Sequence, residues 1–310
     1  MSAAAPARPA RVLAVVTGPT ASGKTGLAIE LARHYGTDVI SADSRQLFRD
    51  IPIGTAAPTA AERQRARHHF VGTLALDQYY SAARYEEDVL ALLPSLWERG
   101  PVAVMCGGSM MYVDAVVRGI DAMPTVSDST RAYVLAMLRE QGLEAVLAQL
   151  RILDPDYWAT VDRSNTRRVV HALEICLESG TTYSSLRTGR SAERDFKVVK
   201  MMIDRPREEL FDRINRRVDA MIADGLVDEA RRAFAQGDFN SLNTVGYKEI
   251  AAYFRGEMDL PTAIARIAKN TRVYAKKQLT WLRRDPSVIR LNPATALPEA
   301  ITAITHAPNS

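Results

Sequence analysis

Short apolar runs and helical segments alternate along the first third of the chain. The runs at 12–16 (VLAVV), 39–41 (VIS) and 102–105 (VAVM) are almost continuously apolar, as strands buried on both faces are. A helix-forming segment follows at 27–35, and the segment at 81–98 places its apolar residues at helical spacing. This alternation predicts a parallel sheet flanked by helices.

The pattern changes between about residues 121 and 191, where helical segments follow one another without strands. Such a stretch predicts a mostly helical insertion in the α/β fold. By contrast, the segment at 43–59 is rich in Pro and Gly and has no apolar period, which predicts a loop. The remaining predicted elements are helices at 110–117, 130–141, 143–153, 164–178, 207–224, 227–236 and 261–284, and a strand at 197–203.

A phosphate-binding motif lies directly after the first predicted strand, where GPTASGKT matches the pattern G-x-x-x-x-G-K-T. In such a loop, backbone N–H groups converge on an anion, and the next helix directs its positive end to the same point. The lysine adds a cation, and the threonine hydroxyl can ligate a divalent ion that bridges phosphate oxygens. The expected binding residues for a di- or triphosphate are Gly18, Pro19, Thr20, Ala21, Ser22, Gly23, Lys24 and Thr25.

The motif and the element order together predict an α/β, P-loop-type parallel sheet flanked by helices, with a mostly helical insertion domain. The core is expected at 11–120 and 196–290 and ends in a basic helix, and the insertion is expected at 121–195. Residues 1–10 are expected to be a disordered tail and residues 291–310 a C-terminal tail.

Polar groups also follow the second and third strands, and in such sheets ligands lie beyond the carboxyl ends of the strands. Asp43 follows the second strand; its carboxylate could accept a proton from an attacking group, or it could only cap a turn. Gly107, Gly108 and Ser109 follow the third strand. Consecutive glycines allow the backbone to approach a ligand closely, or they form only a tight turn. The absence of an Asp at the end of this strand argues against a motor or switch ATPase.

Positive charge is concentrated in one segment of the chain, although the net charge is small. The net charge is +4, but the segment 264–284 holds seven basic residues and no acidic residue. A basic ridge on a helix favours a polyanionic partner, although a solvated helix face would show the same pattern. Arg213 and Arg217 lie one helical turn apart. They could reach a leaving diphosphate or form surface ion pairs with Glu209 and Asp212.

Composition limits the class of protein. A chain of 310 residues with 47% hydrophobic content can bury a substantial core and is long for one phosphate-binding domain. Its two cysteines, Cys106 and Cys176, are too far apart in sequence for a disulfide framework or a metal cage. We expect buried free thiols and a reducing, cytoplasmic location. No apolar run reaches the length of a membrane span, so no membrane partner is expected.

Six blocks of the chain resemble bacterial tRNA dimethylallyltransferases, also called tRNA isopentenyltransferases, over nearly its whole length. The resemblance implies transfer of a dimethylallyl group from dimethylallyl diphosphate to N6 of adenosine 37 in the tRNA anticodon loop. It also implies Mg²⁺ as cofactor. The sequence leaves the oligomeric state open, and a monomer is the default expectation for an enzyme that clasps one stem-loop. The blocks are GPTASGKT (18–25), DSRQLFRDIPIGTAAP (43–58), CGGSMMYVDAVVRG (106–119), RRVVHALEI (167–175), NTVGYKEI (243–250) and NTRVYAKKQLTWLRR (270–284).

The resemblance also implies roles for individual residues. Asp43 matches the general base that acts on N6, and Thr25 matches the residue that holds Mg²⁺. Lys24 and Arg217 would stabilise the leaving diphosphate. The positions that match tRNA-contacting residues are Asp43, Ser44, Arg45, Gln46, Ser109, Arg131, Arg167, Arg168, His171, Asn243, Gly246, Tyr247, Lys248, Asn270, Thr271, Arg272, Lys276 and Lys277.

Three blocks depart from the family's pattern. Ala57 stands where the family has the Lys of GTAKP, which removes a cation near the mouth of the site. Met110 and Met111 replace Gly-Leu in GGTGLY and could reshape the donor pocket. His171 stands where the family commonly has an arginine, which weakens the case for a phosphate contact there. None of these positions belongs to the cradle or its base.

Two other functions would use the same phosphate motif. A P-loop kinase of small metabolites or nucleotides would also use a carboxylate after the second strand, but it would consume ATP and need no basic helix. A non-catalytic RNA-binding protein with a relict loop would tolerate loss of Lys24, Thr25 and Asp43, whereas all three are present. The intact cradle together with the basic helix favours the transferase.

Overall fold

The computed structural model describes residues 10–121, 123–189 and 191–307. The chain divides into two compact units: one runs up to Val117 and resumes at Arg194, and the other is Arg118–Glu193. The tail expected at 1–10 lies, except for Ala10, outside the described residues. Within the described ranges, no helix is both long enough and apolar enough to cross a membrane.

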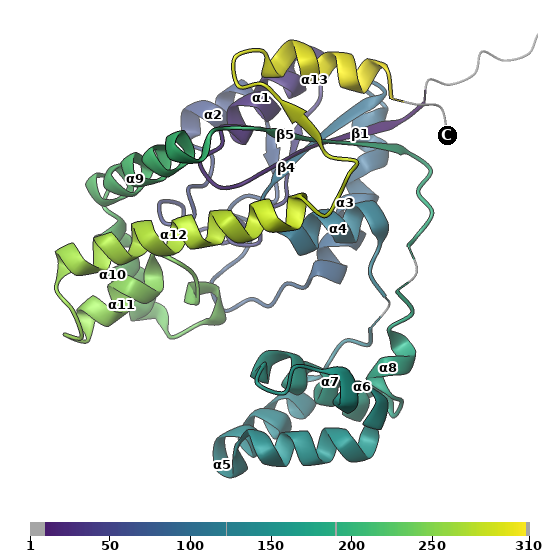
Figure 1. The fold of residues 1–310 in the computed structure, drawn as a ribbon, viewed down its shortest axis with the longest axis vertical. Helices are drawn as coiled ribbons and strands as arrows, with labels where there is room; N and C mark the ends of the chain where they lie inside the picture. The colour runs from purple at the N-terminus through teal and green to yellow at the C-terminus, as the bar shows by residue number, and fades with distance from the viewer. Residues whose placement is uncertain (1–9, 122, 190, 308–310) are drawn as a thin grey trace, which may run out of the picture. The chain divides into compact units, whose positions relative to one another are not determined.

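The first unit is built on a six-stranded sheet, and every strand pair in it is parallel (Figure 1). The strand order is β3-β2-β4-β1-β5-β6, which confirms the predicted parallel α/β fold. Sequence reasoning missed β3 and β6, because strands of two or three residues carry almost no periodic signal. The strands are β1 (Val12–Thr17), β2 (Val39–Ser41), β3 (His68–His69), β4 (Val102–Gly107), β5 (Lys197–Ile203) and β6 (Ile289–Leu291).

Alternate side chains of the central strands face two layers of helices. On β1, Val16 packs in a core with α1 and α13, whereas Val15 packs in a core with α3 and α4 on the other face. A separate core contains residues of α9 to α12 and of the loop after β2. The helices of this unit are α1 (Lys24–Tyr35), α2 (Ala60–Arg65), α3 (Ala82–Trp97), α4 (Met110–Arg118), α9 (Arg207–Ala223), α10 (Leu226–Gln236), η1 (Asn240–Leu242), α11 (Tyr247–Phe254), α12 (Leu260–Leu282) and α13 (Ala296–Thr305).

The prediction of a C-terminal tail at 291–310 is wrong for most of that segment. Ala296–Thr305 forms α13, and Ala300 and Ile304 on this helix are buried in the same core as α1. The apolar residues at every fourth position were the available signal, but the many alanines and prolines of the segment obscured it. Residues 308–310 lie outside the described residues.

The second unit, the insertion unit, contains helices and no strand among its described residues. Its first helix is interrupted at Gly142, where φ is +80° and ψ is 179°. Two helical pieces meet there, which matches the separate helices predicted at 130–141 and 143–153. Val134, Leu150 and Leu173 are fully buried in its core. The helices are α5 (Asp128–Leu153), α6 (Pro155–Thr160), α7 (Thr166–Ser179) and α8 (Tyr183–Leu186).

A buried ion pair joins β5 to the chain just after α12. Lys200 contacts the carboxylate of Asp285, and the two side chains are 7% and 9% exposed. Burial acts to raise the pKa of Asp285, but hydrogen bonds from Lys200 and Ser287 outweigh burial and lower the pKa to about 2. Asp285 therefore stays ionised at every pH at which the protein would normally be handled.

We expect Lys200→Met to reduce the free energy of unfolding by about 3 kcal/mol at pH 7, because Asp285 would keep a buried charge without its partner. Urea unfolding measures this change. The folded pKa of Asp285 is depressed, so its contribution is present above the usual pKa of 3.8 and is lost as pH falls towards about 2. The difference in the free energy of unfolding between the variant and the wild type should therefore become smaller in acid. The double variant Lys200→Met, Asp285→Leu should recover most of the loss; no recovery would contradict this account.

Candidate active site

The phosphate-binding loop connects β1 to α1 and needs left-handed backbone at three positions. The φ angle is +141° at Gly18, +63° at Ala21 and +96° at Gly23. Gly23 is the N-cap of α1, so the first N–H groups of the helix and its positive end are directed at the loop. The helix begins at Lys24 rather than at residue 27 as predicted, so Lys24 and Thr25 are its first two residues.

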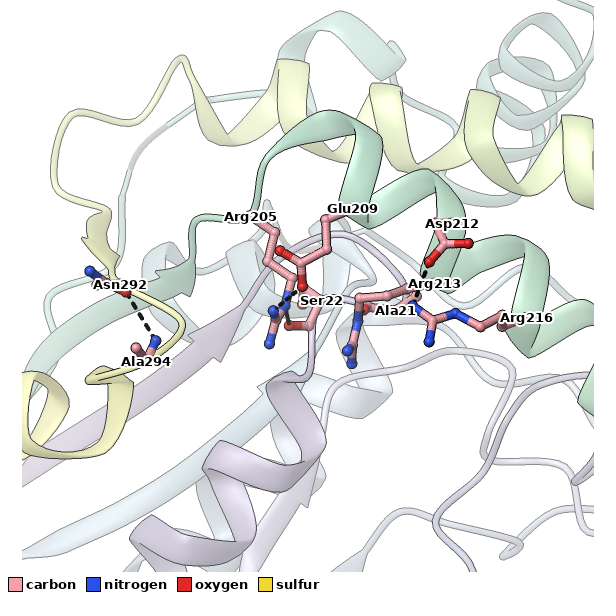
Figure 2. A network of polar contacts seen from close by, with 9 residues as sticks. All are labelled: Ala21, Ser22, Arg205, Glu209, Asp212, Arg213, Arg216, Asn292 and Ala294. Carbon is pink, nitrogen blue, oxygen red and sulfur yellow. Dashed lines mark hydrogen bonds and ion pairs between the residues drawn. The ribbon is translucent and has the colours of Figure 1, made fainter.

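Two arginines hold the outer side of this loop. Nε of Arg205, just before α9, donates to the carbonyl of Ser22 at 2.7 Å, and Nε of Arg213 donates to the carbonyl of Ala21 at 2.8 Å. Figure 2 shows both side chains extending from the region of α9 to the loop. Because the C=O and N–H of a trans peptide point in opposite directions, the N–H that follows Ser22 is directed away from Arg205. The two arginines thus fix the orientation of the cradle.

A cavity of about 350 Å³ lies beside the loop. Four cationic side chains and one hydroxyl face it, which is a set suited to a diphosphate. The lining residues are Ala21, Gly23, Lys24, Thr25, Arg213, Arg216 and Arg217.

The acidic residues of α9 do not neutralise the two arginines singled out from the sequence. Asp212 pairs with Arg216 at 2.5 Å, and Glu209 pairs with Arg205, as Figure 2 shows. Within the described part of the chain, Arg213 and Arg217 have no ion pair. The alternative of surface pairing with Glu209 and Asp212 is therefore wrong, because other arginines take these carboxylates.

Several neighbouring groups shift the pKa of Lys24. Its Nζ donates to the carbonyl of Pro19 at 3.3 Å. Burial lowers the pKa of Lys24, and the positive charge of Arg217 lowers it further, whereas Cys106 and Asp43 act to raise it. Lys24 is thus within electrostatic reach of both the carboxylate and the second cation. An arriving diphosphate would raise the pKa of Lys24 again by adding negative charge.

Of the described residues that line the cavity, Thr25 is the one whose side chain carries an oxygen that could ligate a metal ion. Among the described residues, no group of three or more His, Cys, Asp or Glu side chains could hold a metal. A divalent ion here would take this hydroxyl together with phosphate and water oxygens. Such a set fits Mg²⁺, which keeps several waters and binds substrate phosphates.

Asp43 uses one carboxylate oxygen for its own turn. Its Oδ1 accepts the backbone N–H of Arg45 at 3.0 Å, so the turn-capping alternative is correct for that oxygen. The other oxygen has no hydrogen bond within the described part of the chain. Asp43 is half-buried, so the turn holds the carboxylate in place while one oxygen can still accept a proton from a ligand.

Close protein contacts require glycine at the last position of β4, Gly107, and at the residue after it, Gly108. A Cβ at Gly107 would lie 2.0 Å from the carbonyl oxygen of Ala42, and a Cβ at Gly108 would lie 2.3 Å from Nε2 of Gln278. Close approach of a ligand is therefore not needed to explain them. Next to them, the hydroxyl of Ser109 accepts the N–H of Ser44 at 2.9 Å. This bond joins the ends of β2 and β4.

Sequence reasoning missed Gln278, which links three parts of the site. This side chain of α12 is 3% exposed. Its Oε1 accepts the N–H of Thr20 at 3.0 Å, and its Nε2 donates to the carbonyl of Gly108 at 2.9 Å. The available signal was a glutamine in the otherwise apolar stripe of this helix. A buried polar side chain must find partners, and here the partners are the cradle and the turn after β4.

Gln46 and Arg45 also make contacts within the protein. Oε1 of Gln46 accepts the hydroxyl of Ser41 at 3.1 Å, and its Nε2 donates to the carbonyl of Ala56 at 3.0 Å. Nη1 of Arg45 donates to the carbonyls of Asn240 and Ser241 at 3.1 and 3.2 Å. Arg45 therefore ties the Asp43 turn to η1.

Gly246 and Tyr247, which match tRNA-contacting positions, are buried. The hydroxyl of Tyr247 donates to Glu229, whose two carboxylate oxygens accept the N–H groups of Ile53 and Gly54, each at 2.8 Å. The ring of Tyr247 is 0% exposed, so a direct contact with RNA is wrong for this residue and for its buried neighbour. Tyr247 instead supports the loop after β2, and the N–H of Gly246 donates to Glu249 at 2.8 Å.

The basic residues of α12 lie on two flanks of the helix. Arg272 and Lys276 contact α9: the first donates to an asparagine, and the second lies 5.7 Å from the centre of a phenyl ring. Tyr274 and Lys277 lie on the other flank. Burial raises the pKa of Tyr274 to about 12, and the charge of Asp43 contributes. The flank of Tyr274 therefore faces the Asp43 turn.

Two further predicted positions on α12 have intramolecular partners. Nδ2 of Asn270 donates to Glu249 at 2.6 Å, and the hydroxyl of Thr271 donates to the carbonyl of Ile267 at 2.7 Å. Of the matched positions on α11 and before it, Lys248 is exposed and Asn243 is partly exposed. Both residues line a second cavity, separate from the one beside the phosphate-binding loop.

The insertion unit presents its predicted residues on α5 and α7. Arg167 and Arg168 are exposed near the start of α7. Nδ1 of His171 lies 4.0 Å from Glu174. Burial and then the charge of Arg131 lower the pKa of His171 below its usual 6.5, so this imidazole is neutral at pH 7. A neutral histidine cannot replace the charge of the arginine common in the family.

Known proteins with similar sequences show which family this chain belongs to. A family described as IPP transferase matches residues 46–285. The chain is 49% identical to tRNA dimethylallyltransferase 1 of Phocaeicola vulgatus over 296 residues, which cover 95% of this chain and 99% of that one. It is 50% identical to tRNA dimethylallyltransferase 2 of Parabacteroides distasonis over 281 residues, 91% of this chain and 94% of that one.

Solved structures of similar proteins point to the same family. The tRNA isopentenylpyrophosphate transferase of Bacillus halodurans is 32% identical, with a TM-score of 0.65 and coverage of 96% of this chain and 100% of that one. A eukaryotic dimethylallyltransferase that acts on tRNA shares the fold with a TM-score of 0.73 at 23% identity, over 95% of this chain and 72% of that one. The family match spans more than half of the chain, and the curated relatives cover nearly all of it. This chain therefore belongs to the IPP transferase family.

Proposed function

We propose that this protein transfers the dimethylallyl group of dimethylallyl diphosphate to N6 of adenosine 37 in the tRNA anticodon loop and releases diphosphate. Family membership supports the reaction class. The single observation that carries the proposal is the arrangement at the end of β2. There, Asp43 keeps one carboxylate oxygen without a hydrogen bond among the described residues, within electrostatic reach of the cradle's Lys24.

The chemistry follows from these groups. The bond between C1 of the dimethylallyl group and the diphosphate oxygen breaks, and a bond from C1 to N6 of the adenine forms. Lys24, Arg213 and Arg217 line the cavity and would stabilise the negative charge that develops on the leaving oxygens. Asp43 accepts the proton that N6 loses. Mg²⁺ bound at Thr25 would supply further positive charge to the diphosphate.

The acceptor base must leave its stack to reach Asp43, and unpaired loop bases do so at low cost. Tyr274 is 39% exposed on the flank of α12 that faces the Asp43 turn. An aromatic ring at this place can stack on an extruded base or its neighbour. Exposed arginines of the insertion unit supply cations for RNA phosphates.

The deciding experiment incubates the purified protein with radiolabelled dimethylallyl diphosphate and unmodified tRNA. We expect label in the RNA as N6-dimethylallyladenosine, and none when ATP replaces the isoprenoid donor. A tRNA whose adenosine 37 is replaced by guanosine is the matched control and should stay unlabelled. Consumption of ATP to phosphorylate a small alcohol, without labelling of RNA, would support the kinase alternative instead.

We further propose that the enzyme works as a monomer in the cytoplasm. Both cysteines are free and buried, which suits a reducing compartment. The cradle, Asp43 and Gln278 all come from one unit of a single chain. Light scattering at micromolar concentration tests the monomer directly.

Lys277 is expected to contact a phosphate of the bound RNA. It is exposed, and it lies three residues after Tyr274, on the flank that faces the Asp43 turn. We expect Lys277→Ala to weaken RNA binding and to reduce the slope of log K against log salt by about one. Lys276→Ala removes a second predicted RNA contact about 100° away around the helix, beside the phenyl ring of α9, and shows whether that flank also meets the RNA. A salt slope for Lys277→Ala equal to that of the wild type would remove Lys277 from the interface.

A further inference from the structure

A cavity of about 750 Å³ lies at α10, η1 and α11 and shares no lining residue with the phosphate cradle. Its lining combines aromatic rings with amides and a cation, which is neither a plain apolar groove nor an anion site. The residues that carry the argument are Phe234, Phe239, Phe254, Asn240, Asn243 and Lys248.

The rings of this cavity are held in place by their neighbours. The φ angle of Gly237 is +146°, and a Cβ at this position would lie 2.7 Å from the ring of Phe239. The ring of Phe239 therefore lies directly against bare backbone. Phe234 and Phe254 meet edge to face with their centres 6.4 Å apart, and the guanidinium of Arg231 lies 4.8 Å from the centre of the Phe254 ring. The aromatic wall is thus formed before any ligand arrives.

The rim of the cavity is polar and holds one unneutralised cation. Asn240 is exposed, and its side-chain amide has no hydrogen bond within the described ranges. Lys248 is also exposed and has no ionic partner among those residues. Arg255 at the same rim pairs with Glu257, and Asp238 adds a negative charge near it. Lys248 remains as a cation that can meet a phosphate.

The wall of the cavity is hydrogen-bonded to the turn that holds the general base. The backbone N–H of Arg45 donates to Asp43, and the guanidinium of Arg45 donates to the carbonyls of Asn240 and Ser241. One arginine side chain therefore spans the distance from the carboxylate turn to the cavity wall. The turn and the cavity wall are therefore neighbours, and a nucleotide next to the acceptor could reach the cavity.

We propose that this cavity binds a second unpaired base of the substrate RNA, within two nucleotides of the acceptor adenosine. The base stacks on Phe239, its edge meets the amides of Asn240 and Asn243, and its phosphate lies near Lys248. Proteins recognise unpaired bases with this combination of ring, amide and cation. A lipid or an apolar peptide would leave the amides without partners. The inference rests on the proposed function, because it takes the acceptor to be a base in RNA.

The test uses anticodon stem-loop RNAs in which each of the two bases on either side of the acceptor is replaced in turn by an abasic nucleotide. With the wild-type protein, one abasic position should lower kcat/KM by about tenfold, the effect of losing one stacked base. Phe239→Leu keeps apolar volume but removes the ring. This variant should lose about tenfold on intact RNA and be insensitive to that abasic position. Phe239→Tyr retains the ring and should behave like the wild type.

The proposal is overturned if every abasic position costs Phe239→Leu as much as the wild type. Because Phe239 packs against Gly237, the leucine variant could fail to fold. Asn240→Ala, at an exposed position, then decides: it should narrow the differences in kcat/KM among the four bases at the sensitive position, and unchanged differences overturn the proposal. If the wild type transfers nothing to intact RNA, the proposed function fails, and dissociation constants for the same RNAs still decide whether the cavity binds a base.

Discussion

Asp43→Asn should lower kcat for dimethylallyl transfer by about 10³-fold, within the range that a positioned general base contributes. The amide can still accept the N–H of Arg45, as the carboxylate does at 3.0 Å, so the turn should persist. Its other end cannot take a proton from N6. The loss should therefore appear in kcat and in kcat/KM equally, as for an interaction made only in the transition state.

The dissociation constant for unmodified tRNA should change by no more than a few-fold in this variant, because the carboxylate acts on the proton and not on the phosphates of the RNA. Asp77→Asn, an exposed acidic residue outside the site, is the matched control and should retain full activity. If Asp43→Asn kept near wild-type kcat, the base would have to be another group.

The parts of the site that lie close together in sequence could be predicted from the sequence. The cradle is one continuous loop between a strand and a helix, and its residue types are those of a known phosphate-binding motif. The place of Asp43 followed from the end of β2, because parallel strands end at one edge of the sheet. In each of these cases the local pattern and the fold agree.

The supports of the site could not be predicted, because they join residues far apart in sequence. Gln278 bonds to Thr20 across 258 positions, and Arg205 bonds to Ser22 across 183. No periodicity or motif records such a pairing. The only local sign was a polar residue in an apolar stripe or an arginine near other arginines, and neither sign names a partner.

Tyr247 shows the opposite error, in which a family block suggested a surface role for a core residue. The block NTVGYKEI resembles a tRNA-contacting segment, but its members face different directions on the first turn of α11. Tyr247 is fully buried against Glu229, whereas Lys248 is exposed. Successive residues of a helix lie about 100° apart, so one short block can hold both a core anchor and a ligand contact.

Lys24→Ala should lower kcat/KM for dimethylallyl diphosphate by about 10²- to 10³-fold, the usual cost of removing one donor to a developing anion. The cavity would keep Arg213 and Arg217, so some transfer should remain. Lys269→Ala, which removes an exposed lysine of α12, is the control and should have little effect on the KM for the donor. A donor KM and kcat unchanged in Lys24→Ala would place the diphosphate elsewhere.

The pH dependence of the same variant separates charge from packing. Burial lowers the pKa of Lys24 from its usual value of 10.5, and only the protonated amine attracts the diphosphate. In the wild type, the KM for the donor should therefore rise as pH increases through this lowered pKa, with little effect on kcat at saturation. Bound diphosphate favours the protonated amine and holds the proton in place.

In Lys24→Ala the alkaline rise in the donor KM should vanish, because the titrating group is gone. An alkaline rise of the same size in both proteins would mean that the titrating group belongs to the RNA or to another residue, and that Lys24 acts only by filling space beneath the loop.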